Sequence, residues 1–312
     1  MEDKPPENDT IKENEGNVEE VYDDPNETQK ILKIVIDEMD KNMKNKKPYN
    51  NKIISGIEKL DEILLGFNEG DLNIIASRPG IGKTTFALNM FTNITSQGIN
   101  SLYISFEKKE ADLLKSIIAI ETNIDSIKID NSFFNHDDYK KMINVVGQIY
   151  GNSSIYLKSF YNTDLIKLKK YIEEEIKEDK IKIVFIDYLT MIIPAPSYTN
   201  RWEQVSEISR SLKSMAMEFN IPFVVLCPIH RNIVDISPEI SDLSESGSIE
   251  YEADRVLLLY KKPRKKKDMD DIEDKYISVY VAKNRRGPTA VFDLFFDYKH
   301  KRICDIKYED TI

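Results

Sequence analysis

Cysteine and histidine are scarce in this chain of 312 residues, and their scarcity argues against two kinds of site. The two cysteines, Cys227 and Cys304, lie far apart and form no CxxC pair, so neither a disulfide framework nor a metal knuckle is indicated. We expect both to be reduced residues of the core. The three histidines, His136, His230 and His300, lack the spacing of metal ligands, so we expect no transition-metal site.

Long apolar runs are absent as well. No stretch approaches the roughly 18 uninterrupted apolar residues of a membrane-spanning helix, and the N-terminus is acidic where a secretory signal would be basic and then apolar. The sequence therefore predicts a cytoplasmic protein without a membrane partner. Hydrophobic residues make up 41% of the chain, which is enough for the core of one large domain or two modest ones.

The net charge of -10 is concentrated at one end of the chain. Residues 1 to 27 hold eleven acids against two lysines, a charge of -9, which leaves -1 for all the remaining residues. The folded part is therefore free to present a basic face, and the acidic total does not exclude nucleic acid as a partner.

The N-terminal region divides into three predicted segments. Residues 1 to 23 are acidic and almost without large apolar groups, so we expect a disordered tail. Residues 24 to 43 begin with an acid, a proline and a glutamate in the order of a helix start, and their apolar positions form one stripe. That stripe predicts a helix that docks outside its own neighbourhood; it consists of Ile31, Ile34, Val35 and Met39. Residues 44 to 52, rich in lysine and asparagine, are a predicted linker.

Residues 53 to 312 predict one α/β domain. Short apolar runs alternate with amphipathic stretches of helical length, which is typical of a mostly parallel sheet with helices on both faces. The predicted strands are Leu72 to Ala76, Leu102 to Phe106, Ile181 to Ile186, Phe223 to Cys227 and Val256 to Tyr260. Predicted helices begin near Lys83, Glu110, Asp137, Thr163 and Trp202. Two further runs, Ile277 to Ala282 and Val291 to Phe296, flank a polar turn and predict a C-terminal β-hairpin.

The strongest chemical signal lies between the first of these strands and the helix that follows it. The order of strand, glycine-containing loop and helix is that of a phosphate loop, whose backbone N–H groups surround the phosphates of a nucleotide. A lysine then reaches the β and γ oxygens, and a threonine hydroxyl binds Mg²⁺. We expect ATP and Mg²⁺ here. The nucleotide-binding residues would be Ser77, Arg78, Pro79, Gly80, Ile81, Gly82, Lys83, Thr84 and Thr85, with Ser77 in place of the usual first glycine.

Two acids at strand ends complete the predicted chemistry. Asp187 follows a buried strand about a hundred residues downstream, a position from which it would hold Mg²⁺ beside Thr84. A strand-terminal aspartate could equally cap the next turn, and the phosphate loop favours the metal. Glu107 ends the strand after the loop's helix, so it is a candidate general base for the attacking water, with a plain surface glutamate as the alternative.

Several longer motifs, taken in order, resemble those of the RecA-like motor domain of DnaB-type replicative helicases. They run over about residues 28 to 305, and the ordered set is more specific than any one motif. The matching segments are Ile54-Ser55-Gly56-Ile57, Leu60-Asp61, Gly66-Phe67, Arg78-Pro79, Ile186-Asp187-Tyr188-Leu189, Glu207 to Lys213, Ser241-Asp242-Leu243, Glu245 to Glu250, Ala253-Asp254, Ala282 to Arg285 and Gly287-Pro288.

This resemblance implies roles that the residues alone do not. Glu107 would be the catalytic base and Asp187 the magnesium acid, while Lys283 and Arg285 would reach the γ-phosphate bound by a neighbouring subunit. The stretch from Asp242 to Gly247 resembles a loop that tracks single-stranded DNA. The candidate DNA-binding residues in it are Ser244, Glu245, Ser246 and Gly247.

The implied partners are single-stranded DNA and further copies of the chain. The copies would form a ring, hexameric in this family, and the helix at 24 to 43 resembles the linker helix that packs on the next protomer. A replication loader is a further partner that the resemblance allows.

Three departures from the family pattern qualify these expectations. Pro228 stands where the family has a glutamine that senses the γ-phosphate, and proline has no side-chain donor. Ser244 stands where the family's DNA loop has an arginine. Only the acidic tail precedes the linker helix, so docking of primase through an N-terminal domain is not expected.

Two other functions compete with a helicase. One is a RecA-like ATPase of the recombination-mediator or clock-protein type, which shares the entry motif and the phosphate loop. The other is a ring-forming nucleotide-binding protein with weak hydrolysis, which Pro228 would suit. The ordered segment from Ser241 to Glu250 and the pair Lys283 and Arg285 favour the helicase.

Overall fold

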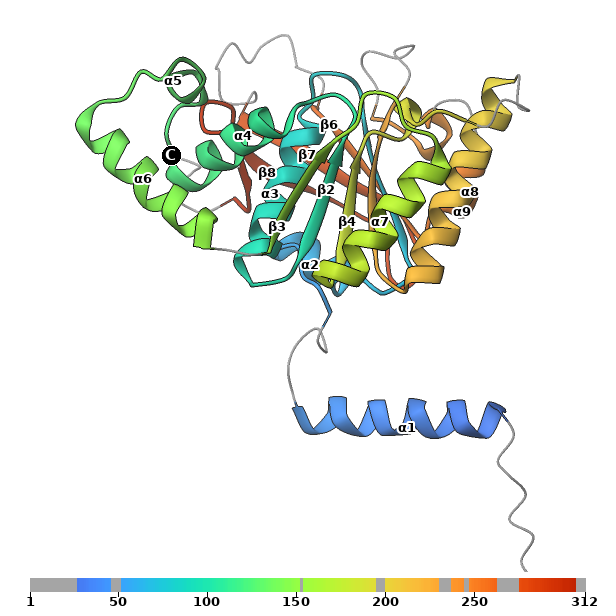
Figure 1. Ribbon diagram of the computed structural model, residues 1–312. Helices are drawn as coiled ribbons and strands as arrows, with labels where there is room; N and C mark the ends of the chain where they lie inside the picture. Colours follow the sequence, from blue (N-terminus) through green and yellow to red (C-terminus); the bar gives the residue numbers. More distant parts are fainter. Residues whose placement is uncertain are drawn as a thin grey trace, which may run out of the picture. The chain divides into compact units, whose positions relative to one another are not determined.

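The computed structural model describes residues 27–45, 52–151, 154–194, 200–229, 237–243, 247–262 and 275–306. The chain divides into two units, Met1–Asn50 and Asn51–Ile312. The described part of the first unit is one helix, α1 (Glu27–Asn45), drawn in blue in Figure 1. The predicted helix is therefore present, and all four residues of its apolar stripe are exposed, at 54% for Ile31, 65% for Ile34, 38% for Val35 and 61% for Met39. The predicted tail and most of the predicted linker lie outside the described residues.

The second unit is built on a nine-stranded sheet in the order β3-β2-β4-β5-β1-β6-β7-β8-β9 (Figure 1). The strands from β3 to β6 in this order pair in parallel, and β7, β8 and β9 continue the sheet antiparallel. The strands are β1 (Leu72–Ser77), β2 (Ser101–Ser105), β3 (Ile155–Ser159), β4 (Ile183–Asp187), β5 (Phe223–Pro228), β6 (Arg255–Tyr260), β7 (Tyr276–Asn284), β8 (Ala290–Asp297) and β9 (Arg302–Cys304).

Helices cover both faces of this sheet, as expected for parallel strands whose central members are mainly apolar and buried. The α-helices are α2 (Glu58–Leu64), α3 (Lys83–Ser96), α4 (Glu110–Thr122), α5 (Ser126–Asn131), α6 (His136–Gly151), α7 (Leu165–Asp179), α8 (Arg201–Phe219) and α9 (Gly247–Glu252). Two short 3-10 helices are η1 (Leu189–Met191) and η2 (Ile240–Asp242). None of the helices in the described part of the chain is long and apolar enough to span a membrane.

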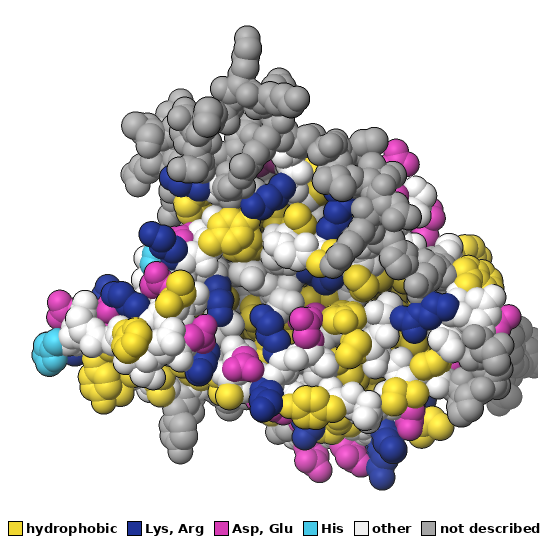
Figure 2. Space-filling view, turned by 90° about the horizontal axis from the view of Figure 1, so that it is seen from above, with side chains coloured by type: hydrophobic (Ala, Val, Ile, Leu, Met, Phe, Trp, Pro, Cys, Tyr) yellow, Lys and Arg dark blue, Asp and Glu magenta, His cyan; other side chains and the backbone are white. Residues whose placement is uncertain are grey.

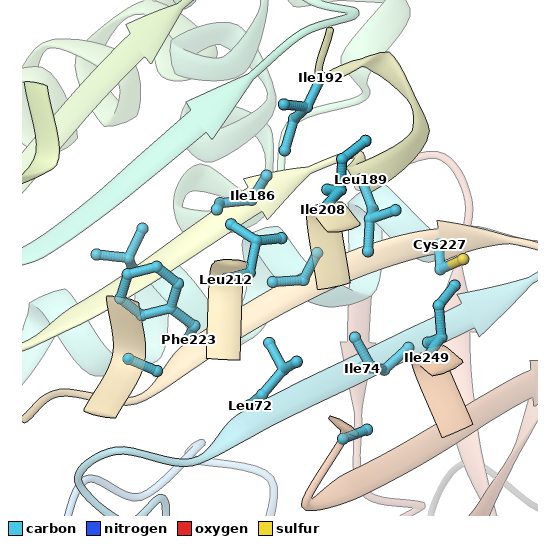
Figure 3. Close-up of a cluster of buried hydrophobic side chains, with 14 of the residues drawn as sticks. Leu72, Ile74, Ile186, Leu189, Ile192, Ile208, Leu212, Phe223, Cys227 and Ile249 are labelled. Carbon is cyan, nitrogen blue, oxygen red and sulfur yellow. The ribbon is translucent and has the colours of Figure 1, made fainter. Parts of the chain in front are cut away.

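The core lies in two layers because alternate residues of each strand point to opposite faces. On β1, Leu72 and Ile74 pack with α8 and α9, where Figure 3 shows them beside Leu212 and Ile249. Ile75 points to the other face and packs with residues of α2, α3 and α4. Since every residue of β1 is buried, this strand fixes the centre of the domain and the point at which the phosphate loop leaves it.

Short polar side chains set the start of two helices close to their predicted positions. Asp164 accepts a hydrogen bond from the backbone N–H of Lys167, at 2.8 Å, at the start of α7. Asn200 accepts one from Trp202, at 3.0 Å, at the start of α8. Such caps satisfy N–H groups that have no partner within the helix, and they define where it begins.

The fold class is confirmed, with additions at the edges of the sheet. The sequence predicted the five central strands and the hairpin but missed β3 and β9, as well as the short helices α2, α5 and α9. Cys227 is buried on β5 as predicted, whereas Cys304 on β9 is only partly buried, because β9 is the outermost strand on its side of the sheet.

Candidate active site at the carboxyl edge of the sheet

The phosphate loop joins β1 to α3 at the edge where the parallel strands end, at the top of Figure 1. Gly80 and Gly82 have φ angles of 80° and 113°, which L residues with a side chain rarely adopt. A Cβ atom at Gly82 would lie 2.7 Å from a ring carbon of Phe296. Both glycines are therefore required by the loop geometry. The helix α3 starts without a side-chain cap, so its first-turn N–H groups face the loop and favour a bound anion.

Thr84 and Asp187 meet beside this loop, although 103 positions separate them in the chain. The Thr84 hydroxyl donates a hydrogen bond to Oδ2 of Asp187 at 2.8 Å, and the buried hydroxyl of Tyr103 donates to the same oxygen at 3.0 Å. Asp187 is 1% exposed. Its second oxygen, Oδ1, is buried and accepts no hydrogen bond within the described residues.

These groups fit a magnesium ion. Mg²⁺ takes oxygen ligands, and it is held in nucleotide sites by one or two protein oxygens together with phosphates and water. The Thr84 hydroxyl uses its proton on Asp187 and keeps its lone pairs for a metal. Oδ1 of Asp187 is a buried carboxylate oxygen whose burial would be compensated by a cation or its water. Burial raises the pKa of Asp187, while the hydrogen bonds from Thr84 and Tyr103 and the charge of Lys83 oppose that rise.

Lys83 lies at the first position of α3, half-buried, with its ammonium 5.7 Å from the ring centroid of Tyr188. Burial lowers the pKa of Lys83, and the neighbouring Cys227, Asp187 and Glu107 act against that shift. A cation that has lost part of its water gains more from a phosphate than a fully hydrated one would. The position therefore suits the contact with β and γ oxygens that the sequence predicted.

Glu107 follows β2 at the same edge of the sheet. Ser105 lies opposite Asp187 in the register between β2 and β4, and the Ser105 hydroxyl accepts hydrogen bonds from the N–H groups of Glu107 and Lys108 at 3.3 and 2.9 Å. This turn directs the chain away from the sheet, and the Glu107 side chain is exposed. An exposed carboxylate near the phosphate site has access to water, but its role as the base stays a prediction.

Lys283 and Arg285 lie at the opposite edge. Asn284, between them, pairs with Arg255 at the start of β6, whereas Ser77 pairs with Leu259, four residues further along that strand. Four residues of strand correspond to about 13 Å, so neither cation approaches the phosphate loop of its own chain.

Both cations instead form hydrogen bonds with groups at and just after the C-terminal end of α9. Arg285 donates to Oδ1 of Asp254 at 3.2 Å and to the carbonyl of Tyr251 at 2.7 Å. Lys283 donates to the carbonyl of Glu250 at 2.6 Å. Carbonyls at a helix C-terminus carry partial negative charge, so they attract cations.

Pro228, a departure from the family pattern, lies at the end of β5. Pro228 pairs with Ser77 and therefore sits beside the phosphate loop. Leu243 bridges Ile229, so the segment before the predicted DNA loop runs past the same strand end. Gly247 is the first residue of α9, but Ser244, Glu245 and Ser246 lie outside the described residues. Seen from above in Figure 2, the described side chains of this face mix lysine and arginine with acids.

Comparison with known proteins identifies the family of the chain. Residues 52–305 match the model of the DnaB-like helicase C terminal domain family. The chain belongs to this family. It is 30% identical over 311 residues to the replicative DNA helicase DnaB of Treponema pallidum (strain Nichols), covering 95% of this chain and 68% of that protein. It is 32% identical over 274 residues to the replicative DNA helicase DnaC of Bacillus subtilis (strain 168), covering 84% of this chain and 58% of that protein.

Solved structures give the same assignment. The chain superposes on a solved ATPase domain with a TM-score of 0.80 and 27% identity, covering 91% of this chain and 100% of that one. A DnaB-like replicative helicase, described together with its interactions with primase, gives a TM-score of 0.77 and 27% identity, covering 91% of this chain and 68% of that one. The RecA-like ATPase fold and its replicative-helicase type are thus confirmed. The chain spans only about three fifths of the length of the Bacillus relative.

Two contacts in the site were missed by the sequence prediction. Tyr103 donates a hydrogen bond to Asp187, and Arg285 donates one to Asp254. The sequence around Tyr103 indicated only a buried strand, and Asp254 was noted only as part of a family motif. Each contact depends on the register between strands, which no local pattern encodes.

We predict that Lys83→Ala lowers ATP hydrolysis by roughly 10² to 10³, because the ammonium stabilises charge on the phosphates, while the fold stays intact. Steady-state hydrolysis, nucleotide binding by calorimetry and thermal unfolding would be measured side by side. Lys167→Ala, which removes an exposed lysine of α7, is the matched control. Hydrolysis at the wild-type rate in Lys83→Ala would disprove the assignment of the loop.

Gly82→Ala should destabilise the protein for two separable reasons. The left-handed backbone costs about 1–2 kcal/mol for an alanine. The contact with Phe296 adds an overpacking cost of about 1–3 kcal/mol. A double-mutant cycle with Phe296→Leu, followed by urea unfolding, should therefore show a favourable coupling between the two changes. Strict additivity would mean that the ring does not restrict this glycine.

Proposed function

We propose that this protein is a ring-forming, ATP-dependent DNA helicase of the cytoplasm, which translocates on single-stranded DNA during replication. One observation carries the proposal. Thr84 and Asp187 meet at the carboxyl edge of the sheet, whereas Lys283 and Arg285 lie at the amino edge. If both pairs act on one nucleotide, two copies of the chain must meet head to tail. Head-to-tail contacts close into rings when the rotation between copies allows it.

The proposed chemistry assigns one task to each group. Lys83 and the loop N–H groups bind the phosphates, and Thr84 and Asp187 hold Mg²⁺, which would neutralise charge on the β and γ oxygens. Glu107 orients and deprotonates the attacking water. Arg285 of the neighbouring copy stabilises the charge that develops on the leaving phosphoryl group, with Lys283 beside it.

The proposed DNA contact involves residues at and directly before the start of α9. We infer that residues 244 to 247 bind the phosphate backbone, by resemblance to the family. The bridge between Leu243 and Ile229 supports a link between this loop and the nucleotide, because Ile229 also donates its N–H to the carbonyl of Ser77, at 3.0 Å. Movement at the DNA loop would thereby reach the start of the phosphate loop.

A second function, a nucleotide-binding ring protein with weak hydrolysis, is favoured by one observation. Pro228 pairs with Ser77 and has no side-chain donor to offer the γ-phosphate. Steady-state hydrolysis with and without single-stranded DNA, together with unwinding of a forked duplex, separates the two. A helicase is stimulated by DNA and unwinds the fork, whereas near-silent hydrolysis in both conditions would favour the second function.

Arg285→Ala should bind ATP almost normally yet lose hydrolysis by roughly 10³ to 10⁵, because an arginine finger acts on the transition state. Arg286→Ala is the matched control, since that neighbouring cation binds Asp71 instead. Mixing Lys83→Ala with Arg285→Ala under subunit exchange should restore part of the activity, because some interfaces then join an intact loop to an intact finger. If exchange is confirmed and no activity returns, Arg285 does not act across the interface.

Deletion of residues 1 to 43 should convert rings into monomers or weak oligomers, whereas deletion of residues 1 to 23 should not. The physical reason is the exposed stripe of α1, whose burial against a neighbouring copy would contribute about 25 cal/mol per Å² of apolar surface. Replacing Ile31 and Ile34 by serine in the full chain is a milder test of the same contact. Sedimentation with ATP present would measure the outcome, and identical hexamers from both truncations would contradict the proposed role of α1.

A further inference from the structure

Tyr103 is a fully buried tyrosine in the middle of β2, and its hydroxyl reaches the candidate magnesium site. Its ring stacks on Phe185 with centroids 5.9 Å apart and planes 11° apart. Phe91 of α3 meets the ring of Tyr103 edge-on at 5.5 Å and that of Phe185 at 5.7 Å. Three interlocked rings leave the side chain little freedom, so packing fixes the position of its hydroxyl oxygen.

Strand register explains why this hydroxyl reaches Asp187. Tyr103 lies opposite Phe185, and Ser105 lies opposite Asp187. Tyr103 and Asp187 are therefore diagonal neighbours on one face of the sheet, and a long aromatic side chain can bridge that separation. The hydroxyl lies 3.0 Å from Oδ2 of Asp187.

The two oxygens of Asp187 are not equivalent. Oδ2 accepts from both Thr84 and Tyr103, whereas Oδ1 is buried and accepts no hydrogen bond in the described part of the chain. A carboxylate with two donors on one oxygen is held against rotation about its Cβ–Cγ bond. Its other oxygen is thereby kept in place for a further ligand.

We propose that Tyr103 is a positioning residue for the metal site, whose hydroxyl holds Asp187 so that Oδ1 faces the magnesium ion or its water. This inference rests on the proposed role of Asp187 as the magnesium acid. An ionised carboxylate only accepts hydrogen bonds, so the hydroxyl acts as the donor. Donors that orient a metal-binding carboxylate contribute to metal affinity without touching the metal.

A purely structural role predicts something different. If the tyrosine only fills the core, its ring matters and its hydroxyl does not. Tyr103→Phe separates these roles, because it keeps the ring in its stack and removes one oxygen. We expect it to raise the Mg²⁺ concentration for half-saturation about tenfold, the lower end of the effect of losing such a donor.

The measurement is binding of ATPγS to the full chain by calorimetry at a series of Mg²⁺ concentrations, with Mn²⁺ binding followed by electron paramagnetic resonance. ATPγS affinity in EDTA should stay within about twofold of wild type, since the phosphate loop is untouched. A rise in the Mg²⁺ requirement with unchanged metal-free affinity supports the proposal. An unchanged Mg²⁺ requirement overturns it.

Two variants control for loosening of the fold. Tyr280→Phe removes a hydroxyl from β7, four positions away from β4 in the sheet, and should leave the Mg²⁺ requirement unchanged. Phe91→Leu loosens the ring cluster but keeps the Tyr103 hydroxyl; it should lower the midpoint of thermal unfolding more than the Mg²⁺ affinity. If Tyr280→Phe raises the Mg²⁺ requirement as much as Tyr103→Phe does, loss of a hydroxyl anywhere in the sheet explains the effect and the proposal fails.

Asp187→Asn distinguishes failure of this inference from failure of the proposed metal site. If Asp187→Asn raises the Mg²⁺ requirement and Tyr103→Phe does not, only the positioning role is wrong. If neither variant changes it, Asp187 does not bind the metal, and the assignment on which the inference rests falls with it.

Discussion

The hydrogen bond between Thr84 and Asp187 is the contact on which the site depends. It joins the first turn of α3 to the end of β4, two strands away from the strand that leads into the phosphate loop. The sheet makes this contact possible, because parallel strands bring their carboxyl ends to one edge. Burial of Asp187 makes the contact with Thr84 necessary, because a carboxylate that has lost its water needs hydrogen-bond donors or a cation. Its two donors among the described residues are hydroxyls, and neither neutralises its charge.

At the amino edge of the sheet, by contrast, the buried acids are paired with cations of the same chain. Asp254 accepts from the N–H of Leu72 at 2.8 Å and from Lys213 at 2.7 Å, and it also binds Arg285. Arg255, 1% exposed, lies between Asp71 and Asn73. These acids are therefore compensated within the chain, while Arg285 remains 46% exposed on its side chain. The carboxyl edge thus has an acid, Asp187, whose charge is not neutralised, and the amino edge has an exposed cation, Arg285. This difference between the two edges would favour contact between copies arranged head to tail.

Features that depend on a short stretch of sequence could be predicted, whereas contacts between distant segments could not. β1 and β4 are mainly apolar runs, and the residues with chemical roles lie at or directly after their ends. The loop, Thr84 and Asp187 could therefore be assigned from order and spacing. β3 could not, because its half-buried residues, including Lys158, lack a clear period of two. The contacts of Tyr103, Asp254 and Arg255 required the register between strands far apart in sequence. Arg255 in particular would be taken for a surface residue, since arginine is rarely buried without a partner.

Pro228 is the departure from the family pattern with the clearest structural consequence. A side-chain donor at this position would lie beside the phosphate loop, because the backbone of Pro228 pairs with that of Ser77. Proline has no such donor, but the backbone contacts of the next residue are unaffected. Ile229 donates its N–H to the carbonyl of Ser77 and forms a β-bridge with Leu243. A backbone connection between the proposed DNA-binding segment and the phosphate loop is therefore kept although the side-chain donor is lost. Coupling through Ile229 would depend on the position of the phosphate loop as a whole, and so on nucleotide occupancy more than on the presence of a γ-phosphate.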